Sequence, residues 1–221
     1  PLLLVYRTLL KPSEGQRKTA TCVPQMPALL LAGQSVVKLI RLYSGCCSMN
    51  GRMWAPQVRP MPPCAGFPLA GQAALKPNGL ILSGGPASVY DKGAPQIDSE
   101  IFSLGVPVLG ICYGLMLMAH HLGGRVIFTG RREYGAGVLH VENGSELLGG
   151  LGEQLDVWNS HGDEVTALPK GFRVAGTTDG CNFAAVEDPE RKLYGLQFHP
   201  EVAHTPRGRE ILQNFLFHIC H

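Results

Sequence analysis

The sequence lacks a strong excess of charge of either sign and lacks any long hydrophobic run. Its 19 Lys and Arg residues against 17 Asp and Glu residues leave a formal net charge of +2, which gives no general attraction to nucleic acid or to an anionic membrane. The apolar runs, such as Ala28–Ala32, are far shorter than the roughly 18–20 residues that a membrane-spanning helix needs. We therefore expect neither a nucleic-acid-binding protein nor a membrane protein.

The cysteines form no disulfide or zinc pattern. There are 7 of them, an odd number, and no Cys-x-x-Cys pair occurs; Cys46 and Cys47 are adjacent, which suits neither a disulfide nor joint ligation of a metal. We expect free thiols in a reducing compartment, which favours the cytoplasm, and we expect no metal site.

Acidic residues are scarce in the first third of the chain. Residues 1–79 hold nine Lys or Arg and one acid, Glu14, whereas residues 80–221 hold ten Lys or Arg and sixteen acids. We expect residues 1–27 to be a disordered extension, with a targeting segment as the alternative. Residues 28–221 are expected to form one domain, in which Leu29–Ala32 would be a strand and Val36–Tyr43 a helix.

From residue 80 onward, short apolar runs alternate with turn residues, as is typical of an α/β protein. The pattern predicts a strand at Gly79–Ser83, a short helix at Asp98–Leu104, a strand at Val106–Ile111 and a helix at Tyr113–Leu122 that ends at glycines. Further β-rich runs follow, and a helix closes the chain; the runs are 138–141, 155–158, 173–177, 183–187 and 193–198, and the helix is 208–220.

Cys112 lies between a predicted strand and a predicted helix, with Gly110 and Gly114 on either side. This Gly-x-Cys-x-Gly arrangement is a nucleophile elbow with cysteine in place of serine, and its glycines allow the backbone to turn sharply. The N-terminus of the following helix favours the thiolate, which is the reactive form. The alternative is a small buried hydrophobic residue at the end of a strand.

A cysteine nucleophile needs a base, and the base needs an acceptor that orients it. His199 and Glu201 lie two residues apart after a predicted strand, so on an extended chain they project to the same side. His161 is a competing base candidate on local grounds. The loop Ser83–Pro86 suits an oxyanion hole, which needs exposed backbone N–H groups. We interpret Arg131–Glu133 as a solvated charge cluster.

Taken together, these motifs resemble the triad-type glutamine amidotransferases, and among them the GMP synthase family. Besides the elbow and the string Phe198–Glu201, five strings match in the family's order: Leu82–Tyr90, Arg132–Gly135, Val157–Glu164, Ala184–Glu187 and Tyr194–Thr205. The resemblance is strong over residues 75–220 and weak over 28–74. It implies an α/β fold with an open, mostly parallel sheet flanked by helices.

The resemblance also implies a role for each matching residue. Cys112 would attack the side-chain amide of glutamine, His199 would transfer the proton, and Glu201 would orient His199. Backbone N–H groups of Gly85 and Tyr113 would bind the oxyanion. A turn would help to hold the glutamine; it consists of Ser160, His161, Gly162 and Asp163.

In the family, the products are glutamate and ammonia, and the ammonia passes to an ATP pyrophosphatase part. That part uses ATP and Mg²⁺ to adenylate XMP and aminate it to GMP. The sequence contains no Ser-Gly-Gly-x-Asp-Ser loop for ATP. We therefore expect no cofactor in this chain, and an ATP pyrophosphatase domain or subunit of GMP synthase as its partner.

The sequence departs from the family at position 116, where a Gln that helps to bind substrate is replaced by Met116. Two interpretations follow. The chain is an active glutaminase, or it is a catalytically weakened glutaminase-fold module that docks on a synthetase partner. A different thiol hydrolase built on the same elbow is a third interpretation.

Overall fold

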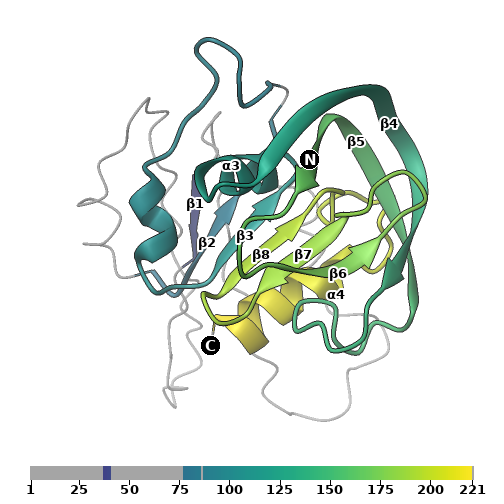
Figure 1. Cartoon of the computed structure of the whole chain (residues 1–221). Coiled ribbons are helices and arrows are strands. Elements are labelled where there is room, and N and C mark those ends of the chain that lie inside the picture. The colour runs from purple at the N-terminus through teal and green to yellow at the C-terminus, as the bar shows by residue number, and fades with distance from the viewer. Residues whose placement is uncertain (1–36, 41–76, 86, 221) are drawn as a thin grey trace, which may run out of the picture.

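The computed structural model describes residues 37–40, 77–85 and 87–220 (Figure 1). The expectations for residues 1–27 and for a strand at Leu29–Ala32 lie outside these residues. So does the weakly matched segment 28–74, except for 37–40. Within the described part of the chain, none of the helices has the length and apolar character that crossing a membrane requires.

The strands form one 8-stranded sheet in the order β1-β2-β3-β8-β7-β6-β4-β5. The parallel neighbours are β2, β3 and β8, and all other neighbours are antiparallel. The strands are β1 (Val37–Ile40), β2 (Gly79–Leu82), β3 (Val108–Ile111), β4 (Arg125–Val141), β5 (Gln154–Ala167), β6 (Arg173–Thr177), β7 (Ala185–Asp188) and β8 (Leu193–Leu196).

The α/β class is confirmed, but the described sheet is mixed and not mostly parallel. Between β3 and β8 the chain adds only one helix and then builds β4 to β7. The connections within 142–192 are short, and short connections join antiparallel strands, whereas parallel neighbours need a longer crossover. The parallel part is thus confined to the three strands beneath the predicted elbow.

The predicted helix at Val36–Tyr43 is wrong where the structure describes it. Val37–Ile40 is strand β1, which pairs antiparallel with β2 and places Val37 opposite Leu82. The segment contains two β-branched residues, which favour strands. Its pairing also covers the edge that β2 would otherwise expose.

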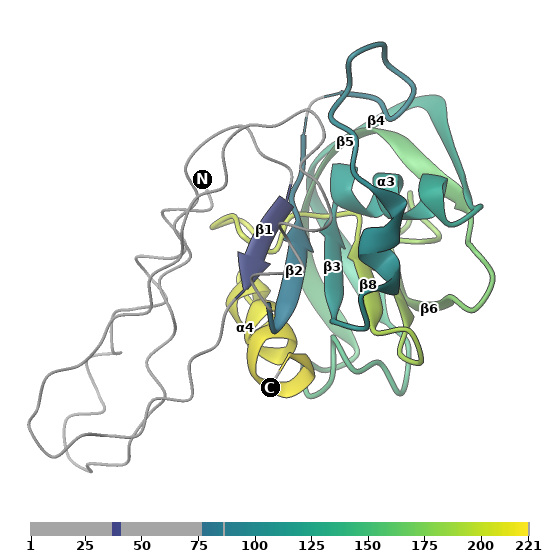
Figure 2. The same cartoon turned by 90° about the vertical axis from the view of Figure 1, so that its left-hand side faces the viewer.

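The parallel strands are buried, as expected for strands covered on both faces. Helix α3 (Tyr113–His121) covers one face, and α4 (Gly208–Gln213), continued by the π-helix η2 (Asn214–Ile219), covers the other (Figure 2). On β8, Tyr194 packs on Phe215 of η2 with ring centroids 6.1 Å apart. The next residue, Gly195, faces Leu115 of α3.

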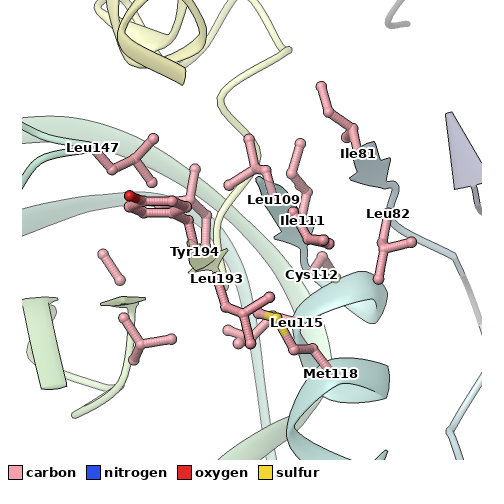
Figure 3. Packing of buried hydrophobic residues seen from close by; sticks show 14 of the residues in the cluster. Ile81, Leu82, Leu109, Ile111, Cys112, Leu115, Met118, Leu147, Leu193 and Tyr194 are labelled. Atoms are coloured by element: carbon pink, nitrogen blue, oxygen red, sulfur yellow. The ribbon is translucent and has the colours of Figure 1, made fainter. Parts of the chain in front are cut away.

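The other three helix predictions, at 98–104, 113–122 and 208–220, are confirmed in position. The segment at 98–104 forms η1 (Ser99–Ser103), a 3₁₀-helix whose first turn is capped by Asp98, which accepts the Glu100 N–H at 3.0 Å. Helix α3 ends before Gly123, whose φ of 86° suits glycine. Figure 3 shows side chains from β3, β8 and α3 packed together, among them Ile111, Leu193 and Leu115.

The longest elements, β4 and β5, form a curled ribbon that the sequence pattern revealed only in part (Figure 1). The predicted runs at 138–141 and 155–158 are short pieces of these strands. The remainder was missed because glycines and charged residues break the alternation on which strand prediction relies. The ribbon matters for the site because the end strand β5 returns to the end of β8, where the His199 N–H donates to the Trp158 carbonyl at 3.0 Å.

Candidate active site

Cys112 occupies the turn between β3 and α3 with a φ of 52° and a ψ of −107°. A positive φ is rare for a residue other than glycine, and such strain typically marks a functional site. Neither Gly110 nor Gly114 has room for a side chain. A Cβ at Gly110 would lie 2.7 Å from the backbone of Gly114, and one at Gly114 would overlap the Leu82 carbonyl. The predicted nucleophile elbow is therefore present.

His199 and Glu201 form a hydrogen-bonded pair beside this elbow. The Nδ1 atom of His199 lies 2.8 Å from Oε1 of Glu201, and their side chains are 16% and 6% exposed. Burial lowers the pKa of His199, but hydrogen bonds and charge interactions with Cys112 and Glu201 outweigh it and raise the pKa to about 10. His199 thus interacts both with Cys112 and with Glu201, in the arrangement predicted for the triad.

Gly84 marks the point where the β2 loop, the elbow and the end of β8 meet. A Cβ at Gly84 would lie 2.9 Å from Cε1 of His199 and 3.6 Å from the Cβ of Cys112. Only a residue without a side chain fits between these two groups. In the sequence this glycine is only one residue of the loop Ser83–Pro86, and the Gly-Gly pair after a buried strand is the one signal that marks it.

The two predicted oxyanion-hole residues, Gly85 and Tyr113, lie side by side. A Cβ at Gly85 would be 3.6 Å from Cγ of Tyr113. Tyr113 begins α3, so its N–H belongs to the first turn, where no intrahelical acceptor exists. Its buried ring is fixed by the hydroxyl, which donates to the Pro95 carbonyl at 2.7 Å. Both residues therefore lie at the corner next to Cys112.

The predicted turn at Ser160–Asp163 is wrong as a turn, because these residues continue strand β5. The irregularity is in the partner strand: Phe128 pairs with Asp163 and Glu133 with His161, so residues 129–132 oppose a single residue. The carbonyl oxygen of Ser160 lies 3.7 Å from Sγ of Cys112. Gly162 and Asp163 are half-buried.

His161, the competing base candidate, points to a different acid. Its Nε2 atom lies 3.4 Å from Oε2 of Glu133, and its side chain is 2% exposed. Burial lowers the pKa of His161, and the nearby His199 lowers it further, against the opposing effect of Glu133. The interpretation of Arg131–Glu133 as a solvated cluster is wrong for Glu133, whose side chain is only 23% exposed. Because this contact joins different strands, local sequence carried no signal for it.

Met116 lies in the first turn of α3, where its N–H donates to the Cys112 carbonyl at 3.1 Å. Its side chain is 3% exposed and belongs to the hydrophobic core. The residue is therefore close to the nucleophile along the helix, and its predicted effect on substrate affinity stays a prediction.

The other two cysteines in the described part of the chain are buried, as Cys112 is. Burial raises the pKa of both Cys181 and Cys220 to about 12. Within the described ranges, no group of three or more His, Cys, Asp or Glu side chains could hold a metal ion.

Comparison with known sequences gives a consistent set of relatives. The sequence profile named "Glutamine amidotransferase class-I" matches residues 63–219. Over 146 residues, which are 66% of this chain, the sequence is 57% identical to a GMP synthase (glutamine-hydrolyzing) of Lactococcus lactis subsp. cremoris. It is 53% identical over 146 residues to the enzyme of the same name from Natranaerobius thermophilus. The chain spans 28% and 29% of the lengths of these relatives.

Two solved structures are also similar. The crystal structure of a candidate GMP synthase subunit from Thermoplasma acidophilum has a TM-score of 0.56 at 33% identity, covering 69% of this chain and 77% of that one. A glutamine amidotransferase from Thermotoga maritima has a TM-score of 0.52 at 23% identity, covering 66% and 63%. The second likeness concerns the fold alone.

Proposed function

Because this chain belongs to the class-I glutamine amidotransferase family, we propose that it hydrolyses glutamine to glutamate and supplies ammonia for the amination of XMP to GMP. One observation carries the proposal. Cys112, at a strained strand-to-helix elbow, interacts with His199. The Nδ1 atom of His199 lies 2.8 Å from Oε1 of the buried Glu201 carboxylate. The names of the most similar relatives support GMP synthesis as the use of the ammonia.

In the proposed reaction, Sγ of Cys112 attacks the side-chain amide carbon of glutamine. Glu201 occupies Nδ1 of His199, which leaves Nε2 to take the thiol proton and pass it to the leaving nitrogen. Ammonia departs and a thioester remains on Cys112. Water then adds to the thioester with His199 as the base, the carbon–sulfur bond breaks, and glutamate leaves with the thiol restored.

The tetrahedral intermediates of both steps carry a negatively charged oxygen. The backbone N–H groups of Gly85 and Tyr113 are the donors we assign to it, since the two residues lie side by side at the N-terminus of α3. Donors that are already in place stabilise such a charge without reorganisation, which is typically one of the largest contributions to catalysis.

We assign substrate binding to the segment of β5 that faces the elbow. Its residues are Ser160, His161, Gly162 and Asp163, and the Ser160 carbonyl already lies 3.7 Å from the Cys112 thiol. Met116 is included as a substrate-affinity position because it lies one turn beyond Cys112 on α3.

The use of the ammonia requires a second protein part. The chain covers under a third of the length of its GMP synthase relatives, so we assign the amination to an ATP pyrophosphatase domain or subunit that uses ATP and Mg²⁺. We place the reaction in the cytoplasm, where free thiols persist.

A weakened glutaminase-fold module is the second candidate function. The observation that favours it is Met116, because a buried thioether cannot donate a hydrogen bond and accepts one only weakly. Such a module would bind a synthetase partner while hydrolysing glutamine slowly.

The test is a glutaminase assay of the wild type and of Cys112→Ala, each with and without an ATP pyrophosphatase partner. Removal of the nucleophile should lower turnover by at least roughly a thousandfold, with the circular dichroism spectrum unchanged. His199→Ala should show a deeper loss than His161→Ala. Turnover retained in Cys112→Ala, or the deeper loss in His161→Ala, would contradict the assigned mechanism. A folded wild type without turnover in either condition would favour the weakened module.

A further inference from the structure

Glu133 and His161 form a second acid–histidine pair, which the triad chemistry does not use. Their closest atoms, Oε2 and Nε2, are 3.4 Å apart. Among the described residues, neither of these two buried atoms makes a well-directed hydrogen bond, either to the other or to a third group. A buried polar atom without a partner is costly, so each has the other as its available partner.

The pair lies where the β4–β5 ladder is interrupted. Glu133 and His161 are opposite each other, and the next pair along is Phe128 with Asp163, so residues 129–132 bulge away from the ladder. A bulge removes the backbone hydrogen bonds that hold two strands in register. A side-chain contact across the strands at this point takes over part of that restraint.

The same contact is linked to the nucleophile through one peptide group. The carbonyl of Ser160 and the N–H of His161 belong to a single planar unit. The oxygen of this unit lies 3.7 Å from Sγ of Cys112. Fixing the His161 side chain therefore restrains the orientation of the carbonyl that contacts the thiol.

Gly180 leaves room for the Glu133 carboxylate. A Cβ at Gly180 would overlap the carboxylate oxygen Oε1. Gly180 does not have the positive φ that would itself demand glycine, so the requirement is one of space. The surrounding turn is closed by two hydrogen bonds between the backbones of Thr178 and Cys181, at 2.9 and 3.3 Å.

We propose that Glu133 is a positioning residue for the glutamine site: it anchors the His161 ring and thereby holds the Ser160–Asp163 backbone against Cys112. The inference rests on the proposed function, since it assigns glutamine to that backbone. Burial and the nearby His199 lower the pKa of His161, which favours a neutral ring with an N–H available to the Glu133 carboxylate, whose Oε2 lies 3.4 Å from Nε2.

Three variants separate this role from a general structural one. Glu133→Ala removes the carboxylate. Gly180→Ala displaces the carboxylate but leaves both Glu133 and His161 in the chain. Glu133→Gln keeps an oxygen that can accept the His161 N–H. We expect KM for glutamine to rise about tenfold in the first two, kcat to change less than about threefold, and Glu133→Gln to stay near the wild type. Glu153→Ala, an exposed acid at the start of the same ribbon, is the matched control.

A second measurement does not depend on turnover. Iodoacetamide alkylates Cys112, peptide mapping follows the label, and glutamine is added as a protecting ligand. The glutamine concentration that halves labelling should rise about tenfold in Glu133→Ala and Gly180→Ala, while labelling without glutamine is unchanged.

The outcomes are distinguishable. If glutamine does not protect the wild type, the proposed function fails. If it protects the wild type, Glu133→Ala and Gly180→Ala equally, the proposed function stands and the positioning role of Glu133 is overturned. If Glu133→Ala does not fold, the comparison of Gly180→Ala with Glu133→Gln takes its place. Glutamine protection in folded Gly180→Ala that equals that of the wild type then overturns the inference.

Discussion

The backbone N–H of His199 donates to the carbonyl of Trp158 over 3.0 Å, which joins the end of β8 to the far end strand of the sheet. The hydroxyl of Thr205 completes the connection. It donates to the His199 carbonyl at 2.7 Å and accepts the Trp158 N–H at 3.1 Å. The backbone of the proposed base is therefore held on both sides by β5 and by one buried hydroxyl.

Thr205→Val should weaken both the fold and the reaction. The change keeps the shape of the side chain but removes the partner of a partly buried carbonyl and a partly buried N–H, which costs about 1–3 kcal/mol. Because one of these groups is the His199 carbonyl, kcat should also fall. Thermal unfolding and a glutaminase assay measure the two effects, and Thr205→Ser, which keeps the hydroxyl, is the control. Equal stability of the valine and serine variants would argue against this network.

Alkylation at neutral pH should select Cys112 over Cys181 and Cys220. Burial raises the pKa of the last two thiols to about 12, so almost none of either is thiolate at pH 7. A glutamine-like electrophile followed by peptide mapping should therefore label Cys112 first. Equal labelling of the three cysteines in the folded protein would show that the elbow does not activate its thiol.

Glu201→Gln should reduce the rate without abolishing it, because orienting the base contributes less than the nucleophile or the base itself. It should also change how stability depends on pH. Folding raises the pKa of His199 from 6.5 to about 10, so the stability this provides is complete below pH 6.5 and lost as the pH rises through about 10.

The stability advantage of the wild type over Glu201→Gln should accordingly be largest near pH 6.5 and shrink toward pH 10. Thermal unfolding of both proteins across this range measures it. A difference that grows with pH would contradict the assigned pair of His199 and Glu201.

Met116→Gln should lower KM for glutamine. A glutamine side chain at this position can both donate and accept, and one hydrogen bond to a charged substrate group corresponds to roughly 10- to 150-fold in affinity. The residue is 3% exposed, so the variant must first be shown to fold by its unfolding transition. An unchanged KM in the folded variant would mean that another residue makes this contact.

The local parts of the site could be predicted from the sequence because each depends on neighbours along the chain. Gly110, Cys112 and Gly114 specify an elbow by their spacing, and His199 and Glu201 share a side because they are two residues apart. The buried strands under the elbow were recognisable as short apolar runs between turn residues.

The contacts between distant segments could not be read in this way. Gly84 fits between Cys112 and His199, and Glu133 faces His161 across a strand interrupted by a bulge. The spacing of these residues along the sequence predicts neither contact.

The sequence by itself thus predicted the proposed nucleophile, its proposed base and the α/β order of the elements around them. Only the tertiary structure decided that Val37–Ile40 is a strand and that β5 curls back onto the end of β8. The physical reason is that an edge strand and a curled ribbon are fixed by strands far along the chain. Pairing with those strands satisfies their backbone N–H and C=O groups, and the local sequence does not show which strands will pair.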